Sequence, residues 1–128
     1  MSSENVEKLS KALKGNVCAH VAELIASGID VNQAGAEEMR PLQHAAESGC
    51  THCLTLLLSH GAEIEATDAY GVTALSHAAR HGKLAAVEFL HDSGASALVA
   101  NQRGRLPLHN ACLEQHVEVA RFLLQKYA

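Results

Sequence analysis

The feature that most constrains the fold of this chain is a repeat with a period of 33 residues. The residues that recur at this interval are Gly28, Gly61 and Gly94; Ala45, Ala78 and Ala111; and Val21, Leu54, Val87 and Ala120. A fixed period of this length is typical of stacked supersecondary units, each of which contacts only its neighbours. The sequence therefore predicts a linear array of similar units rather than one central core.

The copy at residues 68–99 is the clearest, and it predicts a turn followed by two short helices. Gly71 lies in the turn, and Thr73 offers its hydroxyl to the first free amides of a helix. Gly82 ends that helix and Gly94 ends the next one. The apolar positions expected to face the core are Leu75, Ala78 and Ala79 in the first helix and Leu84, Val87, Phe89 and Leu90 in the second. Helices shorter than about 12–15 residues are marginal alone, so the units must stack.

These stretches resemble the ankyrin repeat. The resemblance is carried by residues 68–82, which read Asp-Ala-Tyr-Gly-Val-Thr-Ala-Leu-Ser-His-Ala-Ala-Arg-His-Gly, by residues 40–49 and 105–112, and by the closing turns at Gly61 and Gly94. It implies an all-α ankyrin-repeat solenoid of about four stacked helix-turn-helix units with short hairpin loops. We expect a single domain over residues 1–128, with a capping unit at 4–34, repeats at 35–67 and 68–100, and a closing unit at 101–128.

The copies differ in ways that bear on stability. Arg40 and Leu106 stand at the helix-cap positions where Thr73 stands in the third copy, so each lacks a side-chain acceptor worth about 1 kcal/mol. The first copy has no such signature, and residues 4–14 predict a polar, lysine-rich amphipathic helix. Such a helix suits a capping unit, because its outer face must meet water.

Composition excludes several functional classes. The formal charge of −4, from 14 acidic and 10 basic residues, argues against a nucleic-acid partner, which would require a basic surface. The polar opening Met-Ser-Ser-Glu-Asn lacks the pattern of a secretion signal, and no apolar run is long enough to cross a membrane. Four cysteines without a disulfide-framework spacing favour a reducing compartment, the cytoplasm or the nucleus.

Nine histidines raise the question of a metal or catalytic site. Cys50 and Cys53 form a single CxxC next to His44 and His52, which is half of a zinc spacing, and His109 precedes Cys112 and His116 at ligand-like intervals. In the repeat register, Cys53 is predicted to be a small core residue and the two histidines to bind the backbone of turns. No phosphate-binding loop, nucleophile elbow or HExxH motif is present, so we predict no metal, no cofactor and no enzymatic activity.

The resemblance implies binding to another protein, with the chain acting as an adaptor or inhibitor. Residues 11–15 and 21–32 and the sequence from Arg40 to Leu42 are similar to myotrophin-like members, which sequester the actin-capping heterodimer. The alternative is a segment that positions other parts of a larger multidomain protein. We expect a monomer. Leu24 and the sequence Asp30-Val31-Asn32 also resemble the substrate pattern of asparaginyl hydroxylases, although Asn32 is predicted to bond within its own turn.

The resemblance places the binding surface in a concave groove, lined by the turn tips and the exposed face of each first helix. The residues predicted to contact a partner are Glu37, Met39, Glu47, Tyr70, Val72, Arg80, His81, Arg103, Arg105 and Leu113. Flanking positions in the same groove are Ala36, Ser48, Ala69, Gln102 and Glu114. We expect Tyr70 to be the central anchor, with acidic residues toward the N-terminal end of the groove and arginines toward the C-terminal end.

Overall fold

The computed structural model describes residues 7–8, 11 and 18–127, and within these ranges every regular element is a helix. The helices are α2 (Cys18–Ala26), the 3-10 turn η1 (Ala36–Glu38), α3 (Pro41–Ser48), α4 (Thr51–Ser59), α5 (Ala74–Arg80), α6 (Leu84–Asp92), α7 (Pro107–Leu113) and α8 (Val117–Tyr127). None of these described helices is long and apolar enough to span a membrane. Most of the helix expected at residues 4–14 lies outside the described residues.

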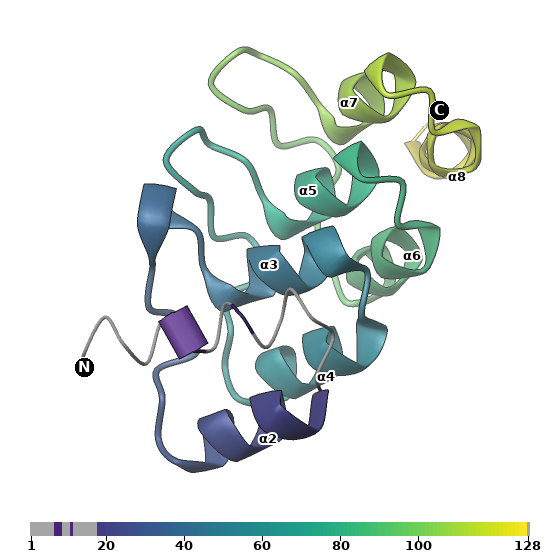
Figure 1. Cartoon of the computed structure of the whole chain (residues 1–128). Coiled ribbons are helices and arrows are strands. Elements are labelled where there is room, and N and C mark those ends of the chain that lie inside the picture. Colours follow the sequence, from purple (N-terminus) through teal and green to yellow (C-terminus); the bar gives the residue numbers. More distant parts are fainter. Residues whose placement is uncertain (1–6, 9–10, 12–17, 128) are drawn as a thin grey trace.

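The helices form two layers, as the sequence predicted for a helical repeat (Figure 1). The inner layer contains α3, α5 and α7, which contact one another in that order. The outer layer contains α2, α4, α6 and α8, and each outer helix contacts the next. The hairpin loops that precede α5 and α7 extend from one side of the inner layer (Figure 1). The units therefore stack in chain order, and each contacts its neighbours only.

Small residues allow the inner helices to pack closely. Ala45, Ala46, Ala78 and Ala79 are fully buried, so that α3, α5 and α7 approach one another through alanine faces. Larger side chains fill the space between the layers, and those that are fully buried include Leu54, Leu57, Leu75, Val87 and Leu90. In α6 the buried stripe is Ala86, Val87 and Leu90, whereas the predicted core residues Leu84 and Phe89 are only half-buried at its edge.

The N-terminus of α5 is capped as predicted, whereas the N-termini of α3 and α7 have a hydrogen bond that was not predicted. The Thr73 hydroxyl accepts a hydrogen bond from the Ser76 amide at 3.3 Å, as predicted. Arg40 and Leu106 make no side-chain cap, as expected, but their own amides are satisfied by the third residue of each helix. The Arg40 amide donates to Gln43 Oε1 at 2.8 Å, and the Leu106 amide donates to His109 Nδ1 at 2.9 Å.

Gly82 marks a place where neighbouring units nearly touch. Its φ is +69°, and a Cβ added to it would lie 2.5 Å from Nδ1 of His116 in the following unit. Nε2 of His116 in turn donates to the Arg80 carbonyl at 2.8 Å, which ties the two units together. Gly49 is similar, because its Cβ would lie 2.8 Å from Cδ of Lys83. Only glycine fits at these contacts without moving the next unit.

Candidate partner-binding groove

Two of the hairpin tips are held by one side chain each, and this fixes the direction of the residues at the tip. The Asp68 carboxylate accepts hydrogen bonds from the amides of Tyr70 and Val72 at 2.9 and 3.0 Å. Asn101 stands 33 residues later, and its Oδ1 accepts from the amides of Arg103 and Arg105 at 2.9 and 3.1 Å. The same local geometry thus presents Tyr70 in one tip and Arg103 in the next.

Backbone hydrogen bonds join the tips to one another. The Ala69 amide donates to the Glu37 carbonyl at 2.9 Å, and one repeat later the Gln102 amide donates to the Tyr70 carbonyl at 3.0 Å. The Gln102 side chain adds a bond to the Ala69 carbonyl at 2.8 Å. The row of tips is therefore one connected edge of the molecule rather than three independent loops.

The tip of the second repeat is built differently because Gly35 stands where the later tips have Asp68 or Asn101. Without a side-chain acceptor, this tip forms the 3-10 turn η1, in which Glu37 and Glu38 adopt left-handed φ values of 57° and 58°. Non-glycine residues rarely adopt this conformation, which costs roughly 1–2 kcal/mol per residue. The strain turns both carboxylates outward, where they are exposed.

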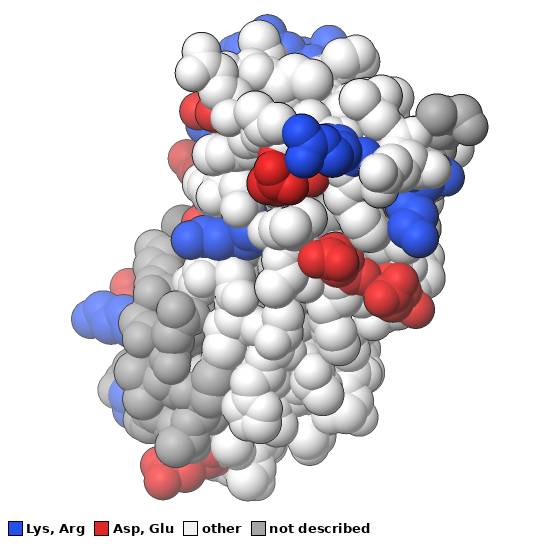
Figure 2. Space-filling view, turned by 90° about the vertical axis from the view of Figure 1, so that its right-hand side faces the viewer, with Lys and Arg blue, Asp and Glu red and all other residues white. Residues whose placement is uncertain are grey.

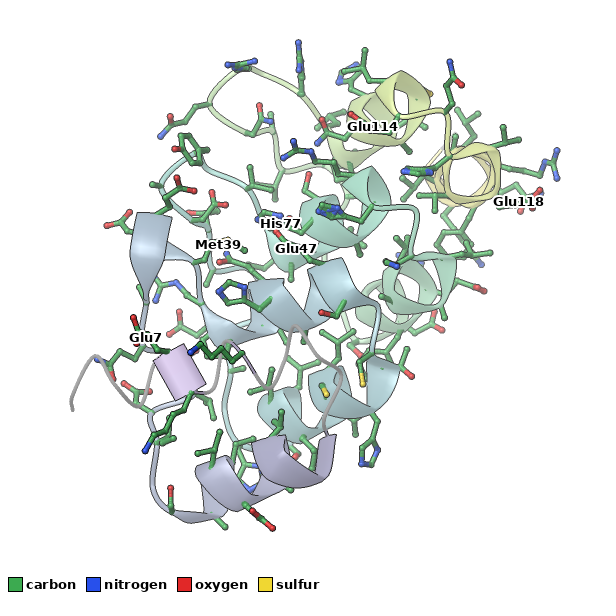
Figure 3. The ribbon with its side chains drawn as sticks, in the orientation of Figure 1. Glu7, Met39, Glu47, His77, Glu114 and Glu118 are labelled. Atoms are coloured by element: carbon green, nitrogen blue, oxygen red, sulfur yellow. The ribbon has the colours of Figure 1, made fainter. Side chains whose placement is uncertain are left out.

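The tips and inner helices enclose a hollow of about 420 Å³. Its lining combines tip residues with residues from the exposed faces of α3, α5 and α7, and comprises Glu37, Met39, Glu47, Asp68, Tyr70, Val72, His77, Arg80, Asn101, Gln102, Arg103, Arg105, Asn110, Leu113 and Glu114. In Figure 3, Met39, Glu47, His77 and Glu114 follow the inner helices along this side, whereas Glu118 projects from the outer helix α8. We call this hollow the groove.

The structure brings nine of the ten predicted contact residues together in the groove. The exception is His81, which lines an adjoining shallow hollow with Ser48, Lys83 and His116. This residue is the C-cap of α5 and directly follows Arg80, the last groove-lining residue of the helix. Glu47 and Arg80 line both hollows, and the two surfaces are continuous.

A partly buried row of ionisable side chains forms the floor of the groove, with His77 and Asp68 buried and Glu47 and His81 partly exposed, and the sequence analysis missed it. His77 Nε2 donates to Asp68 Oδ2 at 2.9 Å, and Nδ1 of the same ring lies 3.3 Å from Glu47 Oε1. The side-chain contact with His77 lowers the pKa of the Glu47 carboxyl, although partial burial acts in the opposite direction. Burial lowers the pKa of His81, which lies 3.9 Å from the same carboxylate. The row joins α3 to α5 beneath the tips.

This row changes the predicted charge pattern of the groove. Glu47 is already engaged by His77 and His81, so it is not a free anion for a partner. Glu114, one of the flanking positions expected from the sequence, places a carboxylate at the C-terminal end beside the arginines. The side chains of Arg103 and Arg105 are exposed and form no ion pair with any other described residue. The free charges of the groove are thus mainly the arginines of the last tip and the glutamates of the first.

Apolar side chains occupy the middle of the groove without a packing role. Tyr70 is 54% exposed and Leu113 is 60% exposed. Among the described residues, only a few large apolar side chains face solvent in this way. Met39 and Val72 lie in the same lining and are half-buried. Exposed apolar surface gathered in a hollow and rimmed by polar groups is typical of interaction sites.

The opposite face of the molecule has a different character. Figure 2 shows the outer helices, where charged side chains gather over α6 and α8 and are absent from the surface of α4. The exposed residues of α4 are polar and uncharged, namely His52, Thr55 and Ser59. This face has no hollow with an exposed aromatic side chain, so within the described residues the groove is the stronger candidate for a site.

Four of the side chains that suggested metal ligands have structural roles. Cys53 is fully buried, and Cys50 caps α4 by accepting a hydrogen bond from the Cys53 amide at 3.4 Å. The imidazoles of His109 and His116 bind backbone atoms, as predicted. No cluster of three or more potential metal-ligating side chains occurs in the part of the chain that the structure describes.

Asn32 bonds across the hairpin loops rather than only within its own turn. Its Nδ2 donates to the Gly61 carbonyl at 2.9 Å, and its Oδ1 accepts from the Glu63 amide at 2.8 Å. Both partners lie in the loop of the next unit, so the side chain links two repeats.

Comparison with known protein families identifies the repeat. A family model described as ankyrin repeats, in three copies, matches residues 9–101 and again residues 65–128. No curated protein matches the chain.

Proposed function

The chain belongs to the ankyrin-repeat family, and on this basis we propose that it is an adaptor or inhibitor that binds a partner protein through the groove. Members of this family are typically protein-binding modules rather than enzymes. The proposal treats residues 1–128 as a single domain with repeats at about 4–34, 35–67, 68–100 and 101–128. It also assigns the chain to a reducing compartment, the cytoplasm or nucleus, because the spacing of its four cysteines is not that of a disulfide framework.

The observation that carries the proposal is the exposed Tyr70 at the middle of the groove. A tyrosine ring brings a large contact area at little cost in rotamer entropy, and such residues dominate binding energies at interfaces. Val72 and Leu113 extend the apolar area on either side. Arg103 and Arg105 carry free positive charge beside it. This combination suits a partner segment with an apolar side chain flanked by carboxylates.

The proposal is tested by capturing partners with the chain and measuring the effect of Tyr70→Ala on their binding. We expect at least a tenfold loss of affinity, because truncation of such an anchor costs about 2 kcal/mol or more. The melting temperature should change little, since Tyr70 is 54% exposed. Leu98→Ala is the matched control, because Leu98 is also an exposed apolar residue, at 65%, and does not line the groove.

Reversal of Arg103 and Arg105 to Glu should slow association and weaken its dependence on salt, because exposed charges act mainly through long-range attraction. An unchanged affinity for Tyr70→Ala, with loss of binding on substitution of Glu88 or Arg121 in the outer helices, would move the site to the opposite face.

A more specific form of the proposal is the myotrophin-like one, in which the partner is the actin-capping heterodimer. It rests on the sequence similarity at residues 11–15, 21–32 and 40–42, of which residues 12–15 lie outside the described residues. The purified heterodimer is therefore the first candidate to titrate against wild-type and Tyr70→Ala chains. The alternative, a positioning segment of a larger protein, uses the same groove and would be favoured by a longer reading frame.

A further inference from the structure

A second exposed apolar surface lies on α7 and α8. Among the described residues, two of the five large exposed hydrophobic side chains are in α8, where Val117 is 60% exposed and Leu124 is 51% exposed. Cys112, Val117, Ala120 and Leu124 line one open hollow, which we call the end face. The lining of the end face shares no residue with the groove, so the two surfaces can be occupied at the same time.

The end face is the continuation of the interface that joins the repeats. Cys112 and Ala120 occupy the positions that Ala79 and Val87 hold one repeat earlier, where both are completely buried by the following unit. Leu124 corresponds to His91, whose ring is covered by Phe122 of α8 at 5.6 Å in an edge-on contact. The end face therefore has the position and apolar character of a surface built to pack against helices.

One residue of the end face departs from the earlier repeats. Gln115 stands where they have Gly49 and Gly82, and it holds a left-handed φ of 61°. At those glycines an added Cβ would lie within 2.8 Å of a side chain of the following unit. The Cβ of Gln115 occupies the space that stays empty at those glycines, so a helix that packs on the end face has to be placed around it.

We propose that the end face packs against the end face of a second copy of this chain. Val117, Ala120 and Leu124 follow one another at i, i+3 and i+7, which is the spacing of an apolar seam along a helix. In a two-fold antiparallel arrangement centred beside Ala120, Val117 of each α8 faces Leu124 of the second copy. The small Ala120 side chain at the centre allows the two helices to approach closely.

The charges at the rim are compatible with this symmetric contact. Arg121 lies 3.3 Å from Glu118 of the same helix, so each copy presents a neutralised pair. Two copies therefore do not bring like charges together without compensation. The contact is self-complementary, as a two-fold interface requires.

The interface consists of one helix face and its neighbour, and we expect it to bury less than the roughly 800 Å² per partner of typical stable complexes. We therefore expect a weak dimer, which forms at concentrations of about 10 to 500 μM. The prediction from sequence was a monomer. Sedimentation of the full chain over this range decides between them, and we expect the average mass to rise from that of one chain toward that of two.

Leu124→Glu should raise the dissociation constant at least tenfold, because the dimer would bring two unpaired carboxylates into an apolar contact. The variant should still fold, since Leu124 is 51% exposed in the single chain. Leu98→Glu is the matched control, because Leu98 is equally apolar and more exposed but lies outside the end face. It should dimerise like the wild type.

Cys112 provides a direct measure of where the contact forms, because it is an exposed free thiol in the end face. Maleimide labelling of Cys112 should slow as the protein concentration rises in the wild type and in Leu98→Glu, but not in Leu124→Glu. A chain that stays monomeric over the whole range overturns the proposal, and then a helix of another protein becomes the alternative occupant. A dimer that survives Leu124→Glu, or leaves Cys112 labelling unchanged, overturns it as well. None of these outcomes bears on the groove, which Tyr70→Ala tests separately.

Discussion

Replacement of Gly82 by alanine tests whether the repeats are held in register by close contact between units. The new methyl group would lie 2.5 Å from Nδ1 of His116, which is too close for either ring or backbone to stay in place. Gly104→Ala is the matched control. Gly104 has a nearly equal φ of +74°, against +69° for Gly82, but a Cβ there would have no atom within 4 Å.

The two substitutions share a backbone cost and differ in the contact. An alanine with a left-handed φ lowers the free energy of unfolding by about 1 kcal/mol, once the smaller entropy of the unfolded chain is included. This is the whole effect expected for Gly104→Ala. Gly82→Ala adds about 1–3 kcal/mol for overpacking. Displacement of the ring also breaks the bond from His116 to the Arg80 carbonyl, which costs about 0.5–1.5 kcal/mol more. We therefore expect Gly82→Ala to destabilise the chain by about 3 kcal/mol or more.

Urea unfolding followed by circular dichroism measures both costs. The double variant Gly82→Ala with His116→Ala removes the obstructing ring, so the cost of Gly82→Ala should fall to about 1 kcal/mol in that background. Equal costs for Gly82→Ala and Gly104→Ala would refute the reasoning. So would a cost at Gly82 that does not depend on His116.

Further results are expected for the helix caps and for the dependence of stability on pH. Leu106→Thr should raise the free energy of unfolding by about 0.5–1 kcal/mol, because it supplies the missing cap of α7. Arg40→Thr should raise the free energy of unfolding by less, because it also removes the hydrogen bond that Arg40 Nη1 donates to the Asn32 carbonyl at 3.0 Å. Urea unfolding measures both variants. Stability should fall in two steps, first as the pH drops below the ordinary pKa of histidine, 6.5, and again as it drops below the ordinary carboxyl pKa, 4.5. The lowered pKa of Glu47 stabilises the fold above the ordinary carboxyl pKa, and this is lost as the pH falls through the lowered value. The lowered pKa of His81 means that protonation favours the unfolded chain. Glu47→Gln should flatten the acidic part of a plot of melting temperature against pH, and an unchanged plot would contradict this assignment.

The sequence predicted the layout of the fold because the ankyrin-type period places equivalent residues in equivalent environments. Thr73 caps α5, and Ala78 and Ala79 are buried, as their spacing required. Phe89 departs from its predicted core position because the buried stripe of α6 is centred on Ala86, Val87 and Leu90. Hydrophobicity alone does not separate the middle of a helical stripe from its edge.

The groove was predictable in its lining but not in its floor. Nine tip and helix positions follow directly from the repeat register. The contact of His77 with Asp68 and Glu47 joins residues from three separate segments, and no local motif indicates it. The signal that was present is a histidine on the buried side of a helix, since a buried imidazole requires polar partners.

The end face could not be recognised from sequence, because Cys112, Val117 and Leu124 are ordinary apolar residues in helical positions. Their exposure depends on what packs beyond them, which only the structure reveals. Gln115 was the available signal, since it replaces the glycine of the earlier repeats.

The way the hairpin tips are held separates the residues that maintain the fold from those that meet a partner. Asp68, Asn101 and backbone amides fix the shape of the tips from the inner side, whereas Tyr70 and Arg103 project outward and support nothing beneath them. Mutations at the outward positions can therefore accumulate without loss of the scaffold. Homologous chains can therefore acquire different partners by substitution at a few exposed positions. A combinatorial library that varies only those positions would consist largely of folded proteins.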